Sequence, residues 1–209
     1  MVASGDVRFD NGQERRLGAK GRRTRTAILR AAGEAFAERG WPSTTITTIA
    51  GQAGVGTGTI YQYFRSKEDV LAALVGEWAL AALSQVQAWD PSDGRHGLRA
   101  LIGRFVSGYA RTAAFQRVWA EVSLTDPRLA ELRTDMSEVY VRLFADAFVE
   151  GQEAGLLELG GHPTEVARAL CAMVDRYCEQ VFVHGAAPTT PAQTADLLTD
   201  LWAGALALR

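Results

Sequence analysis

The stretch TITTIAGQAGVGTGTIYQYF, residues 45–64, decides the fold of this chain, because it holds two short helical patterns hinged at a glycine. Its β-branched start would score as a strand on propensity alone. The context favours a helix instead, since Thr45 can cap it and Gly54 suits a left-handed C-terminal cap. Apolar residues also recur at helical spacing, at Ile46, Ile49, Ala50 and Ala53. We therefore expect helix, turn and helix here.

The second helix of this pair has one face that can pack against the domain and one face that can contact another molecule. At about 100° per residue, Ile60 and Phe64 fall on the packing side with Tyr63. The opposite side carries Thr57, Gly58, Tyr61 and Gln62. A helix fits the major groove of B-DNA, where hydroxyl and amide groups can meet base edges. An apolar helical pattern from Ile28 to Phe36 supplies a third helix, so residues 25–70 read as a DNA-binding helix-turn-helix domain.

Charge is unevenly distributed along the chain. Residues 1–70 hold 11 Lys and Arg against 7 Asp and Glu, whereas residues 71–209 hold 11 against 17. Only the first third therefore looks built to meet a polyanion. Six basic residues fall between Arg15 and Arg25 without an acid, and we expect residues 1–24 to form a flexible basic arm, in which Arg22 or Arg23 enters a minor groove.

Composition excludes several other classes of protein. With 209 residues, 47% of them hydrophobic, the chain can bury a substantial core. No segment reads as a signal peptide or a membrane span, so a soluble cytoplasmic protein is expected. The three histidines are isolated, which predicts no metal site, and we expect neither a cofactor nor an enzyme. Cys171 and Cys178 lie seven residues apart on one expected helix, beyond disulfide reach, and are expected to be reduced packing residues.

Residues 71–209 continue in helical patterns, so the fold class is all-α with about nine helices. A loop at 90–94 ends a long helix that opens at Ser66, and Pro163 and Pro191 each open a further helix. The helix after Pro163 is apolar on two faces, which is more than one subunit core needs. We therefore expect a partner helix to cover the surplus, with the interface at Val166, Leu170, Val174, Cys178, Leu198, Leu201 and Trp202.

The residues of the helix-turn-helix closely resemble the tetracycline-repressor (TetR) family. The matching motifs are Phe36 with Gly40, Thr45 with Ile49-Ala50, Ala53-Gly54-Val55, Gly58-Thr59-Ile60-Tyr61-Gln62-Tyr63-Phe64 and Ser66-Lys67-Glu68. The resemblance covers about residues 25–75. It implies a homodimeric DNA-binding regulator with an N-terminal helix-turn-helix and a C-terminal ligand-binding and dimerisation domain at 71–209.

The resemblance also implies roles for individual positions. Residues that match base-contacting or backbone-contacting positions are Thr57, Gly58, Tyr61 and Gln62, and those that match phosphate-contacting or supporting positions are Thr45, Thr59, Tyr63 and Lys67. The expected partners are a twofold-symmetric double-stranded DNA operator, a second copy of the chain and a small hydrophobic or aromatic effector. The effector would shift the dimer to a spacing that releases DNA, as a repressor requires. Candidate pocket residues are Trp78, Phe105, Tyr109, Trp119, Tyr140, Phe144, Met173 and Tyr177.

The sequence departs from the family pattern at two positions, and it leaves two alternative functions open. Gly56 stands where the family often has a serine cap, and Thr48 stands where an acid often completes a capping box, so both helix starts should be looser. One rival is an all-helical protein-interaction module without DNA affinity. The other is an enzyme that binds nucleotide at the loop Gly54–Gly58, which lacks the preceding strand that such a loop needs.

Overall fold

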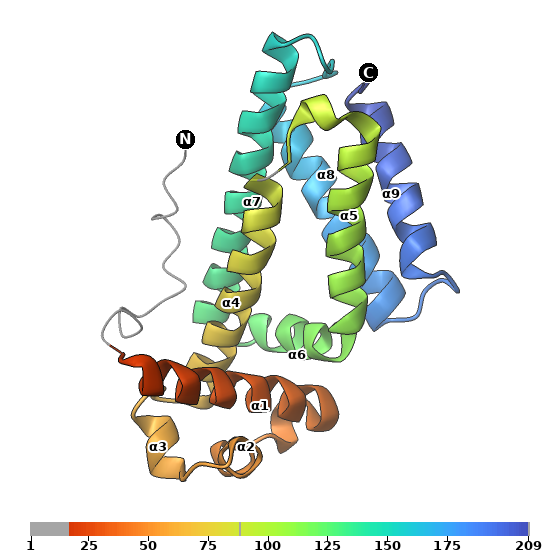
Figure 1. The fold of residues 1–209 in the computed structure, drawn as a ribbon. Helices are drawn as coiled ribbons and strands as arrows, with labels where there is room; N and C mark the ends of the chain where they lie inside the picture. Colours follow the sequence, from red (N-terminus) through yellow and green to blue (C-terminus); the bar gives the residue numbers. More distant parts are fainter. Residues whose placement is uncertain (1–16, 88, 209) are drawn as a thin grey trace. The chain divides into compact units, whose positions relative to one another are not determined.

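A computed structural model describes residues 17–87 and 89–208, and in those ranges every regular element is a helix (Figure 1). The α-helices are α1 (Ala19–Ser43), α2 (Ile46–Ala53), α3 (Thr57–Tyr61), α4 (Lys67–Gln87), α5 (Gly94–Arg111), α6 (Ala113–Ser123), α7 (Pro127–Glu153), α8 (Pro163–Cys178) and α9 (Pro191–Ala205). A 3-10 turn, Pro91–Asp93, precedes α5, and a π-helical turn, Glu179–Val183, follows α8. The expected all-α architecture with about nine helices is confirmed.

The chain divides into two compact units. Among the described residues, the N-terminal unit contains 17–80 with 114–133, and the C-terminal unit contains 81–113 with 134–208. Helices α4 and α7 therefore contribute residues to both units. The sequence placed a single boundary at residue 70, but the segment 114–133 belongs with the helix-turn-helix, because Phe115 of α6 packs edge-on against Trp78 at 4.2 Å and also contacts Phe36.

The core of the N-terminal unit is built from α1, α2, α3 and α4 with the apolar face of α6. Ile28, Phe36, Ile49, Ile60 and Leu71 are all fully buried. These are the positions that the helical periodicity marks as apolar, so the amphipathic pattern explains why the three N-terminal helices pack together. Burying side chains of this size contributes about 1.5–3 kcal/mol each before the entropy of ordering the chain is counted.

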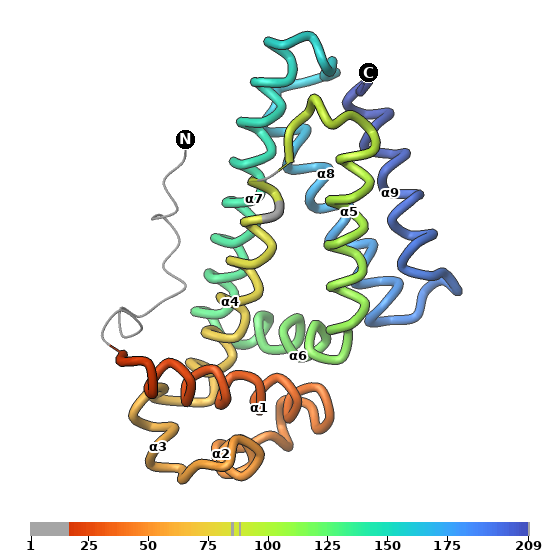
Figure 2. Tube along the Cα trace, viewed as in Figure 1, coloured from red at the N-terminus to blue at the C-terminus, as the bar shows by residue number. Residues whose placement is uncertain are grey.

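The C-terminal unit is centred on α5 and α9, which run side by side (Figure 2). Arg95 pairs with Asp200 and Arg99 pairs with Asp196 along that contact. The same unit contains an aromatic cluster in which Phe144 contacts Trp202 edge-on, with ring centres 4.9 Å apart. Trp89 and Phe148 complete the cluster. A capping box at Thr190 and Gln193 begins α9.

Two expectations from the sequence need correction in the fold. Helix α1 begins at Ala19, so residues 19–24 are helical and do not belong to a flexible arm, while residues 1–16 lie outside the described ranges. Most residues of the two apolar stripes of α8 are buried in the core of their own unit or packed against it, so these stripes are not the surplus apolar face that the periodicity predicted. In the described ranges, no helix has the length and apolarity needed to cross a membrane.

Candidate nucleic-acid interface

Helix α2 is held in place by the signals that the sequence supplies. The Thr45 side chain accepts a hydrogen bond from the Thr48 backbone N–H at 3.1 Å, which is an ordinary N-cap. The Thr48 hydroxyl lies 3.0 Å from the Thr45 hydroxyl, so it supports the cap where the family often uses an acid. Gly54 ends the helix at φ 68°, in the left-handed region that favours glycine. The strand alternative for this segment is excluded.

Helix α3 turns its apolar residues inward and its polar residues outward. Ile60 is fully buried and Phe64 nearly so, whereas the Tyr61 side chain is 57% exposed. Thr57, Gly58 and Gln62 are exposed as well, and Thr59 and Tyr63 are half-buried. Gly56 stands at the N-cap without a side-chain cap, and its carbonyl accepts from the Thr59 N–H at 2.9 Å. The face expected to read DNA is therefore open to solvent.

Lys67, which the family resemblance predicts to contact DNA phosphate or to support the reading helix, stabilises the end of α1. Gly40 has φ 72° and breaks α1, which leaves carbonyl groups without helical partners. The Lys67 Nζ donates to the carbonyl of Trp41 at 2.7 Å and to that of Thr44 at 2.9 Å, and it lies 4.0 Å from the centre of the Trp41 ring. Burial lowers the pKa of Lys67, opposed by the charge of Glu68. The ammonium group thus has protein acceptors of its own.

Arg25 carries a buried charge, whose burial the sequence did not predict. Its Nη1 lies 2.6 Å from the Glu77 Oε1 of α4, and its guanidinium carbon lies 5.7 Å from the centre of the Phe64 ring. The arginine therefore contacts both the residue that follows the reading helix and the helix that leads out of this unit. A signal was available, because Arg25 lies three residues before Ile28 and so continues the buried face of α1.

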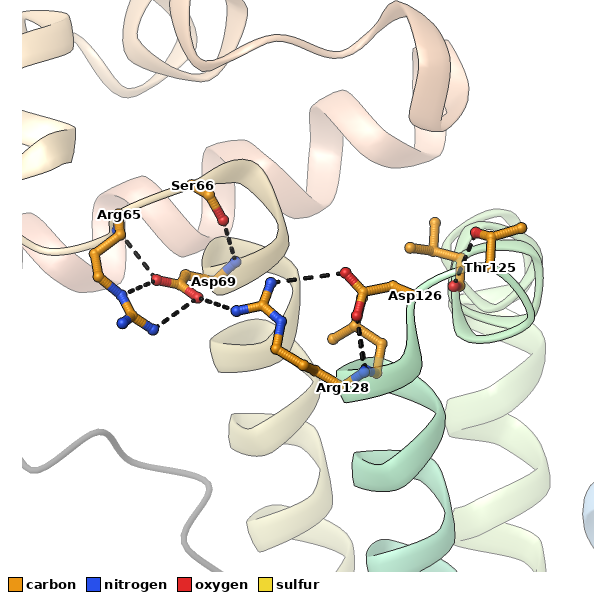
Figure 3. Close-up of polar contacts among 8 residues, drawn as sticks. Arg65, Ser66, Asp69, Thr125, Asp126 and Arg128 are labelled. Carbon is orange, nitrogen blue, oxygen red and sulfur yellow. Dashed lines mark hydrogen bonds and ion pairs between the residues drawn. The ribbon is translucent and has the colours of Figure 1, made fainter.

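Acidic and basic side chains gather where α3 gives way to α4 (Figure 3). Asp69 accepts from the Arg65 Nε at 2.8 Å and from the Arg65 N–H at 3.2 Å, and an Arg128 nitrogen of α7 lies 3.6 Å away. Asp126 caps α7 by accepting from the Arg128 N–H at 2.9 Å. Partial burial acts to raise the pKa of Asp69, but the hydrogen bonds from Arg65 and both arginine charges outweigh it, and the pKa lies below its ordinary value.

Arg22 and Arg23, which the sequence placed on the arm, lie on the exposed surface of α1. Both line a surface hollow with Ala19 and Thr26. The Arg22 guanidinium also donates to the carbonyl of Leu17 at 2.6 Å. Both positions are thus fixed to a helix of the N-terminal unit, whereas Arg15 and Arg16 lie outside the described residues.

The eight candidate effector residues are split between the two units. Trp78 and Trp119 belong to the N-terminal unit. The other six belong to the C-terminal unit: Phe105, Tyr109, Tyr140, Phe144, Met173 and Tyr177. Phe144 is a member of the aromatic cluster and is explained by core packing. Burial raises the pKa of Tyr140 well above its ordinary value, so this phenol stays neutral.

The residues expected at a dimer interface are mostly used inside their own chain. Leu170, Val174, Cys178, Leu198 and Trp202 are buried in the core of the C-terminal unit, and Val166 packs against it. Their apolar character is satisfied by α5 and α7 neighbours in the same chain. Leu201 is different, because it is 47% exposed, and Leu197 one turn earlier is 43% exposed.

The cysteines and acidic residues show no sign of redox or metal chemistry in the described ranges. Burial, helped by the charge of Asp175, raises the pKa of Cys171 and of Cys178 to about 12. The nucleophilic thiolate is therefore scarce at neutral pH. The described residues contain no group of three His, Cys, Asp or Glu side chains that could hold a metal ion.

Comparisons with known proteins agree with this geometry. Residues 28–74 match the family model for bacterial regulatory proteins of the tetR family. The HTH-type transcriptional repressor BepR of Brucella suis is 29% identical over 184 residues, which cover 82% of this chain and 86% of that protein. The fatty acid metabolism regulator protein of Bacillus subtilis is 30% identical over 138 residues, which cover 64% of this chain and 70% of that protein.

Solved structures show the same fold. Salmonella enterica GusR superposes with a TM-score of 0.71 at 24% identity, covering 88% of this chain and 96% of that one. SmeT of Stenotrophomonas maltophilia, a repressor of a multidrug efflux pump, superposes in its complex with triclosan with a TM-score of 0.73 at 24% identity, covering 90% and 92%. Together with the matched helix-turn-helix and the relatives of similar length, these findings show that the chain belongs to the TetR family of transcriptional regulators.

Proposed function

We propose that this protein is a repressor whose α2–α3 pair binds a twofold-symmetric operator in double-stranded DNA. The observation that carries the proposal is the exposed polar face of α3, with Tyr61 more than half exposed beside Thr57, Gly58 and Gln62. The exposed phenol of Tyr61 is not needed to stabilise the fold. A recognition helix does need such groups, because its outward side chains contact base edges and phosphates.

The operator should be read by two copies of the chain. The partner face that we propose lies on α8 and α9 at their exposed positions, Ala169, Ala172, Leu197 and Leu201. Two exposed leucines one turn apart form an apolar ridge, and small residues allow a second helix to approach closely. The buried residues of the same helices then serve only to hold α8 and α9 in place.

An effector in the C-terminal unit would complete the regulator. We propose that a small hydrophobic or aromatic molecule contacts the buried Tyr109 and the partly buried Phe105 and Tyr177. The rings of Phe105 and Tyr109 have centres 6.0 Å apart. Apolar linings with a few polar groups are typical of small-molecule sites. Among the described side chains, the buried indole N–H groups of Trp89 and Trp202 have no acceptor, and an effector oxygen would satisfy such a donor.

The test is retention of random-sequence and genomic duplex DNA by the full-length protein. Wild type should enrich specific duplexes, and Tyr61→Ala should lose at least tenfold in affinity while its helical circular dichroism stays unchanged. Arg142→Gln, an exposed change on α7 in the C-terminal unit, serves as the control and should bind as wild type does. Equal binding by the Tyr61 variant would remove α3 from the interface.

A further inference from the structure

The helix-turn-helix of this protein carries no charge at all. From Gly40 to Phe64 the chain contains no Asp, Glu, Lys, Arg or His, and both α2 and α3 lie within that range. The outward side chains of α3 and of its C-cap residue Gln62 are therefore limited to hydroxyl, phenol and amide groups, at Thr57, Tyr61 and Gln62. Any base that this helix recognises must be recognised by neutral groups.

The nearest basic residues that follow α3 are committed to partners inside the unit. Figure 3 shows the Arg65 guanidinium turned toward Asp69, with Nε–Oδ2 and Nη2–Oδ1 separations of 2.8 and 3.4 Å. Arg128 approaches the same carboxylate from α7. Lys67 donates to two backbone carbonyls at the end of α1. The cations closest in sequence to the reading helix thus stabilise the unit itself.

Glycines lower the surface around these neutral groups. A Cβ atom added at Gly51, Gly56 or Gly58 would meet nothing within 4 Å, so the packing of the chain does not require glycine at these positions. Gly58 lies inside α3, where glycine weakens a helix. The absent side chains let the backbone of this surface approach another molecule closely, with Thr57, Tyr61 and Gln62 as the projecting groups.

The chemistry of the bases then limits what α3 can select. Guanine presents two acceptors in the major groove, which Arg or Lys recognises best, and α3 offers neither. Adenine presents a donor beside an acceptor, which an amide matches with two hydrogen bonds, and thymine presents a methyl group that suits the methyl of threonine. We propose that α3 selects A·T base pairs in each operator half-site, with Gln62 on adenine and Thr57 on the thymine methyl group. This inference rests on the proposed function and adds the base pairs that the site takes.

Selection from a randomised duplex pool with the full-length wild-type protein tests the inference. The enriched half-site should show A·T pairs at its most constrained major-groove positions. The selected thymines are replaced by deoxyuridine one position at a time, which removes only the methyl group. At one position of the half-site, the replacement should lower the affinity about fourfold, the factor for exposing one buried methyl group. Enrichment of G·C pairs at the constrained positions, or unchanged affinity at every deoxyuridine substitution, would overturn it.

Two matched substitutions separate base reading from general attraction to DNA. Thr57→Arg should move one position of each selected half-site from A·T to G·C, because the new guanidinium matches guanine. Thr47→Arg adds the same charge to the exposed surface of α2, and it should strengthen binding to all duplexes and steepen the salt dependence by about 0.9 per added phosphate contact without changing the preferred bases. A Thr57 variant that keeps the wild-type preference would overturn the assignment.

The duplex selection distinguishes a failure of A·T selection from a failure of DNA binding. If the folded wild-type protein enriches no duplex, DNA binding itself is refuted and the inference fails with it. If it enriches duplexes with G·C pairs at the constrained positions, DNA binding stands and only the neutral A·T readout is refuted.

Discussion

Replacing Lys67 by Met should destabilise the N-terminal unit and thereby separate a structural lysine from a phosphate-binding one. The change removes the donor of two hydrogen bonds, at 2.7 and 2.9 Å, and the charge above the Trp41 ring, while keeping an apolar side chain of similar length. Hydrogen bonds from charged groups contribute about 1.5–3 kcal/mol each where water is excluded, and an exposed cation–π contact about 0.5–1 kcal/mol.

Lys67 is only partly buried, so water recovers much of this energy at the freed carbonyls. We therefore expect a loss of about 2–3 kcal/mol in the free energy of unfolding, which corresponds to a fall in Tm of about 4–12 °C for a chain of this size. Urea and thermal denaturation followed by circular dichroism measure it, with Lys20→Met on the exposed surface of α1 as the control. A Lys67→Met protein as stable as wild type, but weaker in DNA binding, would refute the structural assignment and restore the phosphate role.

Further predictions concern acid stability, the thiols and the oligomeric state. Because the folded-state pKa of Asp69 is depressed, its stabilising contribution is present above the unfolded pKa of about 4 and is lost as pH falls through the folded pKa. The difference in unfolding free energy between wild type and Asp69→Asn, measured from pH 7 to pH 3, should therefore shrink. A constant difference would contradict the depressed pKa. Cys178 should react with a thiol reagent only at the rate of unfolding, and rapid modification of this residue in the native protein would contradict its burial. Leu201→Glu should give monomers by analytical ultracentrifugation, whereas a persistent dimer would move the interface away from the exposed face of α9.

Local signals explain how much of the fold the sequence could predict. The N-cap at Thr45, the left-handed Gly54 and the buried Ile60 follow from interactions within a few residues, and the local sequence predicts each of them. They override the strand propensity of the threonine-rich segment, since a capped amphipathic helix buries both Ile49 and Ala50. The polar face of α3 follows from the same periodicity.

Long-range packing explains what the sequence could not predict. The segment 114–133 belongs to the N-terminal unit through Phe115, whose partners are distant along the chain. Val174 shows that an apolar residue in a helical stripe indicates burial without indicating which surface buries it, and here its own chain does so. Lys67 matched a family position in sequence, but its acceptors are carbonyls beside the break that Gly40 makes in α1, and nothing local indicates that a lysine 26 residues after Trp41 reaches them.

The function proposed for this protein requires the exposed face of α2 and α3 to contact duplex DNA. Amide hydrogen exchange of the full-length protein, with and without a selected duplex, tests it most directly, because a bound duplex shields the amides that it covers. We expect slowed exchange concentrated in residues 45–63, with Thr57–Tyr61 among the most strongly protected. Tight duplex binding that leaves exchange in residues 45–63 unchanged would contradict the account.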